Sequence, residues 1–161
     1  MSPLTLIFLI PLLTAVALLF VPTRMERAVR GLTQAATGIS LLLALGVFAQ
    51  FQPGLGYQFV EQHDWMPSLG IGYHVGVNGI NIGLILMGTL VAFAAACSTS
   101  EITQRVKEYH ILLLFMTGGI LGAFVSLDIF MMYFLHELAL VPTFIMIGVW
   151  GHGEDKNFAA F

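Results

Sequence analysis

The chain has 161 residues, of which 58% are hydrophobic and only 9% are charged, and its formal net charge is −3. Soluble domains carry about 25% charged residues, and a soluble core of this size could not enclose so many apolar side chains, so the composition excludes a soluble globular protein. The small net charge and the lack of a basic run argue against a nucleic-acid-binding protein. We therefore expect an integral membrane protein.

Five segments are apolar and close to the length of about 20 residues that a membrane-spanning helix needs. They are residues 3–22, 31–51, 79–99, 109–127 and 129–150. The expected fold class is an all-α membrane protein with five transmembrane helices, formed by residues 1–161 as a single polytopic domain. No basic region precedes the first segment, so we interpret it as a retained helix and not as a signal peptide. The polar residues 52–78 form an outer loop, in which the alternation of "IGYHVGV" weakly indicates a strand or hairpin.

The basic residues predict how the chain is oriented. With five spans, residues 24–30, 100–108 and the tail after 150 lie on one side, and they hold all six lysines and arginines. The positive-inside rule then places the N-terminus outside and residues 24–30 and 100–108 in the cytoplasm. The abrupt ending "GEDKNFAAF" further suggests a fragment of a longer polytopic protein.

Glu137 is the strongest candidate for a functional residue, because it interrupts the apolar stretch "YFLHELALVPTFIMIGVW". It follows Ile129 by about 12 Å of helix, which is close to the middle of a bilayer core. A charged carboxylate there costs about 2.5–3.5 kcal/mol, and burial favours the protonated acid. Such an acid can take up and release protons. The alternative is a neutral acid that makes one hydrogen bond between helices.

Three residues near Glu137 could assist it. His136 could extend a proton path, although neighbours on a helix point about 100° apart, or it could pack against a backbone carbonyl. Pro142 removes an amide donor and could open a hydrated break or only kink the helix. Asp128 could cap the fifth helix or serve as a proton exit at its outer end. The stretch "HELAL" lacks the second histidine of HExxH, and we predict no metal site.

Small residues at a spacing of four predict where helices pack closely. They are Gly79 and Gly83 in the third segment, and Gly118, Gly122 and Ser126 in the fourth. The single cysteine, Cys97, cannot form an internal disulfide. The remaining histidines fall in loops or at helix ends, where we expect solvated or interfacial side chains: His63, His74, His110 and His152.

Several stretches together resemble the antiporter-like membrane subunits of respiratory complex I. They are "LTLIFLIPLLTAVALLF", "YHVGVNGINIGLILM" and "KEYHILLLFMTGGILGAFVSLDIFMMYFLHELALVPTFIMIGVWG". The resemblance implies the N-terminal part of a roughly 14-helix subunit with two inverted five-helix repeats. Glu137 falls on the fifth-helix glutamate of an E-x-x-x-x-P pattern, which is proposed in this family to pair with a lysine of the seventh helix. The chain departs from many members at His136, where they have tryptophan, and at Asn78, where they have aspartate.

The resemblance also implies a function. It indicates a proton-translocating subunit of NADH:quinone oxidoreductase that couples electron transfer to proton pumping through Glu137. The chain itself would hold no cofactor, since NAD, FMN, iron–sulfur clusters and quinone would be bound by other subunits. Its partners would be other complex I membrane subunits, including neighbouring antiporter-like chains that the outer loop contacts, and the lipid of a bacterial inner membrane. Two alternatives stay open: a subunit of an Mrp-type sodium/proton antiporter, and a membrane anchor without transport.

Overall fold

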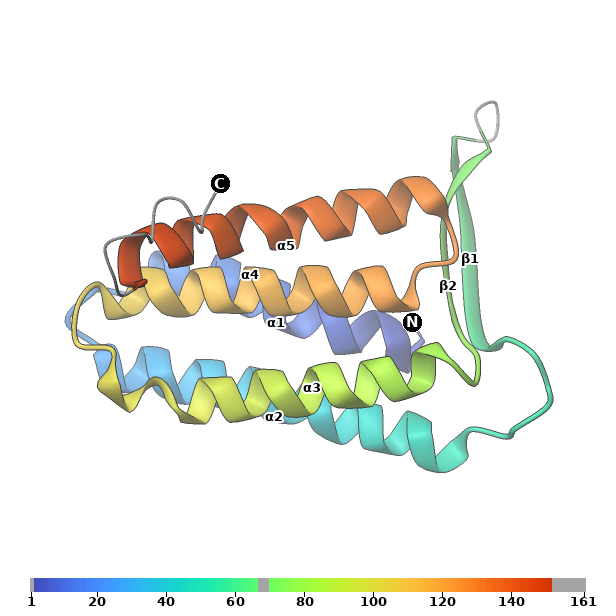
Figure 1. Ribbon diagram of the computed structural model, residues 1–161, viewed down its shortest axis with the longest axis horizontal. Helices are drawn as coiled ribbons and strands as arrows, with labels where there is room; N and C mark the ends of the chain where they lie inside the picture. Colours follow the sequence, from blue (N-terminus) through green and yellow to red (C-terminus); the bar gives the residue numbers. More distant parts are fainter. Residues whose placement is uncertain (1, 67–69, 152–161) are drawn as a thin grey trace.

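The computed structural model describes residues 2–66 and 70–151 (Figure 1). Their elements are α1 (Pro3–Phe20), α2 (Glu26–Gln50), β1 (Gln58–Met66), β2 (Ile71–Val77), α3 (Asn81–Cys97), the short 3-10 helix η2 (Thr99–Glu101), α4 (Val106–Val125) and α5 (Ile129–Trp150). Among these residues, five helical spans are long and apolar enough to cross a membrane. The fold class predicted from the sequence is therefore confirmed. His152 lies outside the described residues.

The helix ends differ from the predicted segments where polar side chains belong to a helix. The second helix begins at Glu26 and not at residue 31. Its first turns carry charged residues, which a count of apolar residues leaves out. The third helix begins at Asn81, because the side chain of Asn78 accepts hydrogen bonds from the amides of Ile80 (2.9 Å) and Asn81 (3.1 Å). An amide oxygen in this position satisfies donors that a helix start leaves unpaired.

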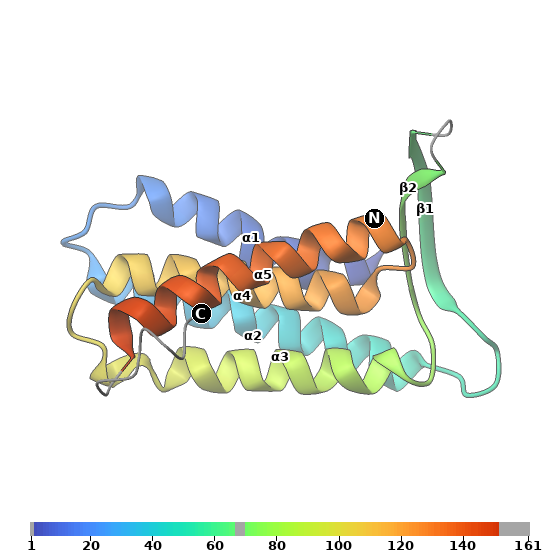
Figure 2. The same ribbon diagram turned by 45° about the horizontal axis from the view of Figure 1, so that its top comes forward.

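The α4 helix is the centre of the bundle, because it contacts α1, α2, α3 and α5 (Figures 1 and 2). Its neighbours come close where α4 carries glycine. A Cβ added at Gly118 would lie 3.0 Å from the carbonyl oxygen of Phe8 in α1, and one at Gly119 would lie 2.7 Å from that of Leu135 in α5. A Cβ at Gly122 would lie 2.8 Å from the side chain of Leu135. The glycines of α4 therefore let α1 and α5 approach its backbone.

The close packing predicted at Gly79 and Gly83 is not seen among the described residues and stays a prediction. Gly79 and Gly83 are exposed, and a Cβ at either would meet no described atom within 4 Å. Gly88, five residues after Gly83, packs on Leu121 of α4 instead. Ser126 caps the end of α4, where it pairs with Val75 of the hairpin and its hydroxyl donates to the carbonyl of Asp128 (3.0 Å). Spacing alone cannot tell which face of a helix meets a neighbour.

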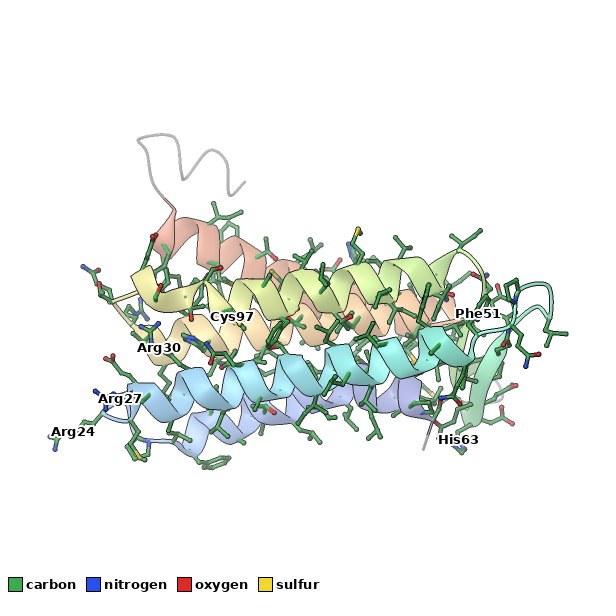
Figure 3. The ribbon with its side chains drawn as sticks, turned by 90° about the horizontal axis from the view of Figure 1, so that it is seen from below. Arg24, Arg27, Arg30, Phe51, His63 and Cys97 are labelled. Atoms are coloured by element: carbon green, nitrogen blue, oxygen red, sulfur yellow. The ribbon has the colours of Figure 1, made fainter. Side chains whose placement is uncertain are left out.

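Strands β1 and β2 form an antiparallel hairpin at one end of the bundle, opposite the end that carries Arg24, Arg27 and Arg30 (Figures 1 and 3). We call these the hairpin end and the arginine end. The hairpin is tied to the helices by backbone, because the amide of Leu127 donates to the carbonyl of His74 (2.8 Å). Val75 and Val77 are fully buried and join the core beside Leu4 and Ile85.

A hydrogen-bonded cluster clamps the hairpin onto the start of α1. The carboxylate of Glu61 in β1 accepts from the hydroxyl of Thr5 (2.6 Å) and from the amide of Ser2 (2.7 Å). Since the Thr5 proton goes to the carboxylate, the hydroxyl of Tyr73 is the donor in its 2.5 Å contact with Thr5. The hydrogen bond from Thr5, which has the largest effect, and the one from Ser2 lower the pKa of Glu61 from 4.5 to about 2. The clamp therefore depends on an ionised Glu61.

This clamp predicts an acid-dependent loosening of the hairpin. A lowered pKa means that Glu61 stabilises the folded hairpin fully above pH 4.5, and that this contribution is lost as the pH falls through 4.5 toward about 2. We expect amide exchange in β1, corrected for its intrinsic pH dependence, to accelerate over that range in the full-length protein. Glu61→Gln should exchange fast at every pH. Asp64→Asn, which changes an exposed acid of the same strand, should keep the wild-type profile. A wild-type profile in Glu61→Gln would contradict the clamp.

Candidate functional site

The α5 helix, which carries Glu137, is held at both ends. At its start, the side chain of Asp128 accepts a hydrogen bond from the amide of Met131 (2.9 Å) and caps the helix. At its end, the indole of Trp150 donates to the carbonyl of Gln104 (3.0 Å), and the guanidinium of Arg105 lies 5.9 Å from the centre of its ring. These contacts fix the rotation of α5 and hence the direction in which Glu137 points.

Glu137 is half-buried and lines a groove of about 430 Å³ between α4 and α5. The other residues that line this groove are apolar: Leu112 and Phe115 of α4, and Phe134, Leu138, Val141 and Pro142 of α5. The hydroxyl of Tyr133, one helical turn before Glu137, forms a hydrogen bond with the carboxyl group. The site is thus a carboxyl group with a phenol beside it on an otherwise apolar wall.

The depth of Glu137 in a membrane stays a prediction, and among the described residues it is half-buried. The reason lies in the packing of α5, which contacts α4 extensively and β2 at its start. Its remaining faces are exposed apolar surface, including Tyr133, Phe134, Leu140, Val141 and Phe144. The groove therefore has one wall from α4 and one from α5, and it is open on the third side.

The structure does not bring His136 and Glu137 together. His136 is exposed, whereas Glu137 is half-buried and is one of the residues that line the groove. Pro142 does share the groove with Glu137, and it leaves the carbonyl of Leu138 without its helical amide donor. Asp128 is separate from the groove, and its carboxylate lies 3.5 Å from the amide of Gly72 in the hairpin.

Two residues of interest were missed or misplaced from the sequence. Tyr133 was not predicted as a site residue, although a tyrosine one helical turn before an acid is close enough to contact it. His110 was expected to be solvated, and that expectation is wrong because its side chain is fully buried. The fourth helix begins at Val106, so His110 lies a full turn inside it, and η2 covers it. Within the described ranges, no group of three histidine, cysteine or acidic side chains could hold a metal ion.

The fold and the groove define a polytopic helical membrane protein with a half-buried acid on its last described helix. No family model matches the sequence. The chloroplast NAD(P)H-quinone oxidoreductase chain 4 of Chara vulgaris is 32% identical over 98% of this chain and 32% of that protein. NADH-quinone oxidoreductase subunit M of Rhodobacter capsulatus is 35% identical over 84% of this chain and 26% of its own length.

The comparison with solved structures supports the same family. A chain of respiratory complex I from Thermus thermophilus with bound NADH superimposes with a TM-score of 0.78 and 26% identity, over 98% of this chain and 31% of its own length. The chain therefore belongs to the antiporter-like membrane subunits of respiratory complex I. It spans between about a quarter and a third of the length of the curated relatives that it matches. A chain of an archaeal membrane-bound sulfane sulfur reductase shares the fold, with a TM-score of 0.73 at 16% identity.

Proposed function

We propose that the chain is part of a proton-translocating subunit of NADH:quinone oxidoreductase, in which Glu137 gains and loses a proton during turnover. The observation that carries this proposal is the position of Glu137, which lines an apolar groove and has Tyr133 as its hydrogen-bonding neighbour. A carboxyl group in such a place holds its proton or releases it according to the charges that come near. Membership of the complex I family supports it further.

The geometry suggests how the carboxyl would work. A cation brought to the open side of the groove would favour the carboxylate, since opposite charges attract strongly where water is scarce. Withdrawing the cation would leave the carboxylate poorly solvated, and it would then take up a proton. The hydroxyl of Tyr133 would stabilise the carboxylate by donating to it. We propose that the cation is a lysine of the full-length subunit, as the family resemblance implies.

In this proposal electron transfer takes place elsewhere in the complex. NAD, FMN, iron–sulfur clusters and quinone would be bound by other subunits, and this chain would respond to them through neighbouring membrane subunits. The membrane would be the bacterial inner membrane, with the arginine end of the bundle in the cytoplasm. The clustering of Arg24, Arg27 and Arg30 at that end supports this orientation (Figure 3).

A subunit of an Mrp-type sodium/proton antiporter is the main rival, because the fold alone does not identify complex I: a chain of an archaeal membrane-bound sulfane sulfur reductase has it too. The full-length chain, in its assembled complex in liposomes, distinguishes the two. We expect NADH oxidation to drive proton movement equally well in sodium-free buffer and in sodium-containing buffer, measured with a pH-sensitive dye inside the vesicles. Proton movement that occurs only when sodium is present, or that reverses with the sodium gradient, would favour the antiporter.

A further inference from the structure

The fully buried side chain of His110 is a titratable group that the proposed function does not use. It lies in the second turn of α4, at the arginine end of the bundle. Its Nδ1 is 2.7 Å from the carbonyl oxygen of Val106, and its Nε2 is 3.2 Å from the hydroxyl oxygen of Thr99 in η2. A carbonyl only accepts, so Nδ1 carries a hydrogen in every protonation state of the ring.

The hydrogen bonds around Thr99 are fully satisfied only when Nε2 also carries a hydrogen. The hydroxyl of Thr99 lies 3.0 Å from the carbonyl oxygen of Ala96, to which it donates, as well as 3.2 Å from Nε2 of His110. A hydroxyl has one hydrogen, so with a neutral ring it serves either Ala96 or His110, and the other contact has no hydrogen. With a protonated ring, Nε2–H donates to Thr99 and Thr99 donates to Ala96. The geometry thus contains the acceptors for an imidazolium.

One cation opposes that state. The guanidinium of Arg30 in α2 donates to the carbonyls of Thr99 and Ile102 (2.7 Å for the latter), and its charge disfavours a positive charge on His110. The acids of the adjoining elements, Glu101 of η2 and Glu108 of α4, are exposed, and the ring of Tyr109 lies edge-on at 5.7 Å. The hydrogen bonds to Val106 and Thr99 therefore favour protonation of His110. The burial of its ring and the charge of Arg30 oppose it.

We infer that His110 and Thr99 form a proton-binding site at the arginine end of the bundle, controlled by Arg30. When a proton binds to Nε2, the hydroxyl of Thr99 turns to Ala96, and the ends of α2, α3 and α4 are joined by a complete hydrogen-bonded chain. When the proton leaves, the single hydroxyl hydrogen of Thr99 serves either Ala96 or His110, and the chain loses one of its hydrogen bonds. This site is separate from Glu137, because Leu112 and Phe115 form the wall of α4 that faces the groove, whereas His110 points toward η2.

Ring nitrogen signals of histidine, followed by solid-state NMR of the full-length protein in liposomes, test this site. The His110 signal is the one that disappears in His110→Gln; should that variant not accumulate, it is the one that Thr99→Val displaces. We expect a ring protonated only on Nδ1 at high pH and on both nitrogens at low pH. At a fixed pH within the change, Arg30→Gln should raise the ratio of doubly to singly protonated rings about three- to tenfold. Thr99→Val should lower this ratio.

Two controls separate this role from simple packing. Arg30→Lys keeps the positive charge and should leave the ratio close to the wild-type value. Arg27→Gln removes an exposed arginine from the same helix and should leave it unchanged. The proposal is overturned if His110 stays singly protonated throughout, or if its ratio responds to neither Arg30→Gln nor Thr99→Val. Neither result would bear on Glu137, since the measurement reports on the histidine alone.

Discussion

Replacing Glu137 with glutamine is expected to abolish most proton translocation while the complex still assembles. Glutamine has nearly the same shape and still hydrogen-bonds with Tyr133, so the packing of α4 on α5 is preserved. It has no proton to exchange, and it gains no stabilisation from a cation in the groove. A side chain that transfers a proton raises the rate of that step by about a hundredfold or more. We therefore expect the number of protons translocated per NADH oxidised to fall at least about tenfold. The measurement is the initial rate of vesicle acidification, divided by the rate of NADH oxidation, in liposomes that contain the full-length chain in its complex.

Glu101→Gln is the matched control for this substitution. It removes an acid of the same type from an exposed position in η2, so the ratio of protons to NADH should remain at the wild-type value. If Glu137→Gln also keeps that value in an assembled complex, Glu137 is a structural hydrogen-bonding residue and the chain is acting as an anchor at this position. A loss in both variants would instead indicate a general effect of removing negative charge.

The substitution with the largest expected effect on stability is Gly119→Ala. A Cβ at this position would lie 2.7 Å from the carbonyl oxygen of Leu135 and 2.9 Å from the amide nitrogen of Ala139. Both atoms belong to the backbone of α5, which cannot turn aside as a side chain can. The helices must therefore separate, at a cost of about 1–3 kcal/mol. Because Leu135 and Ala139 flank Glu137, proton translocation should fall together with the melting temperature of the full-length protein.

Gly83→Ala is the control for this effect. The same methyl group added to α3 would meet no described atom within 4 Å, and alanine favours a helix over glycine by about 0.5–1 kcal/mol. The melting temperature should stay the same or rise slightly. If Gly119→Ala melts like Gly83→Ala, the close approach of α4 and α5 is wrong, and the groove around Glu137 has a different shape.

Much of the fold could be predicted from the sequence because a bilayer imposes simple demands. Each span must be long and apolar, and Glu137 was conspicuous because it breaks an apolar run. The prediction lost accuracy where polar residues belong to helices, as at the start of α2 near Glu26. It also failed for His110, because the turn formed by η2 was taken for an open loop.

The sequence could not predict which faces of the helices pack against each other, because such contacts join residues that are far apart in the chain. Gly79 and Gly118 have the same local pattern, yet only Gly118 lies against another helix. For the same reason His136 and Glu137, adjacent in sequence, have different surroundings in space: His136 is exposed and Glu137 lies in the groove. The role of Tyr133 becomes visible only in the folded helix, which places its hydroxyl beside the carboxyl group of Glu137.

The exchange of a proton at Glu137 can be observed directly by infrared difference spectroscopy. The full-length chain, in its assembled complex, would be compared at rest and during NADH oxidation, with glutamate labelled by ¹³C to identify glutamic acid bands. The account predicts a change in the band of a protonated glutamic acid during turnover, which is absent in Glu137→Gln and present in Glu101→Gln. The same change in wild type and in Glu137→Gln would contradict it.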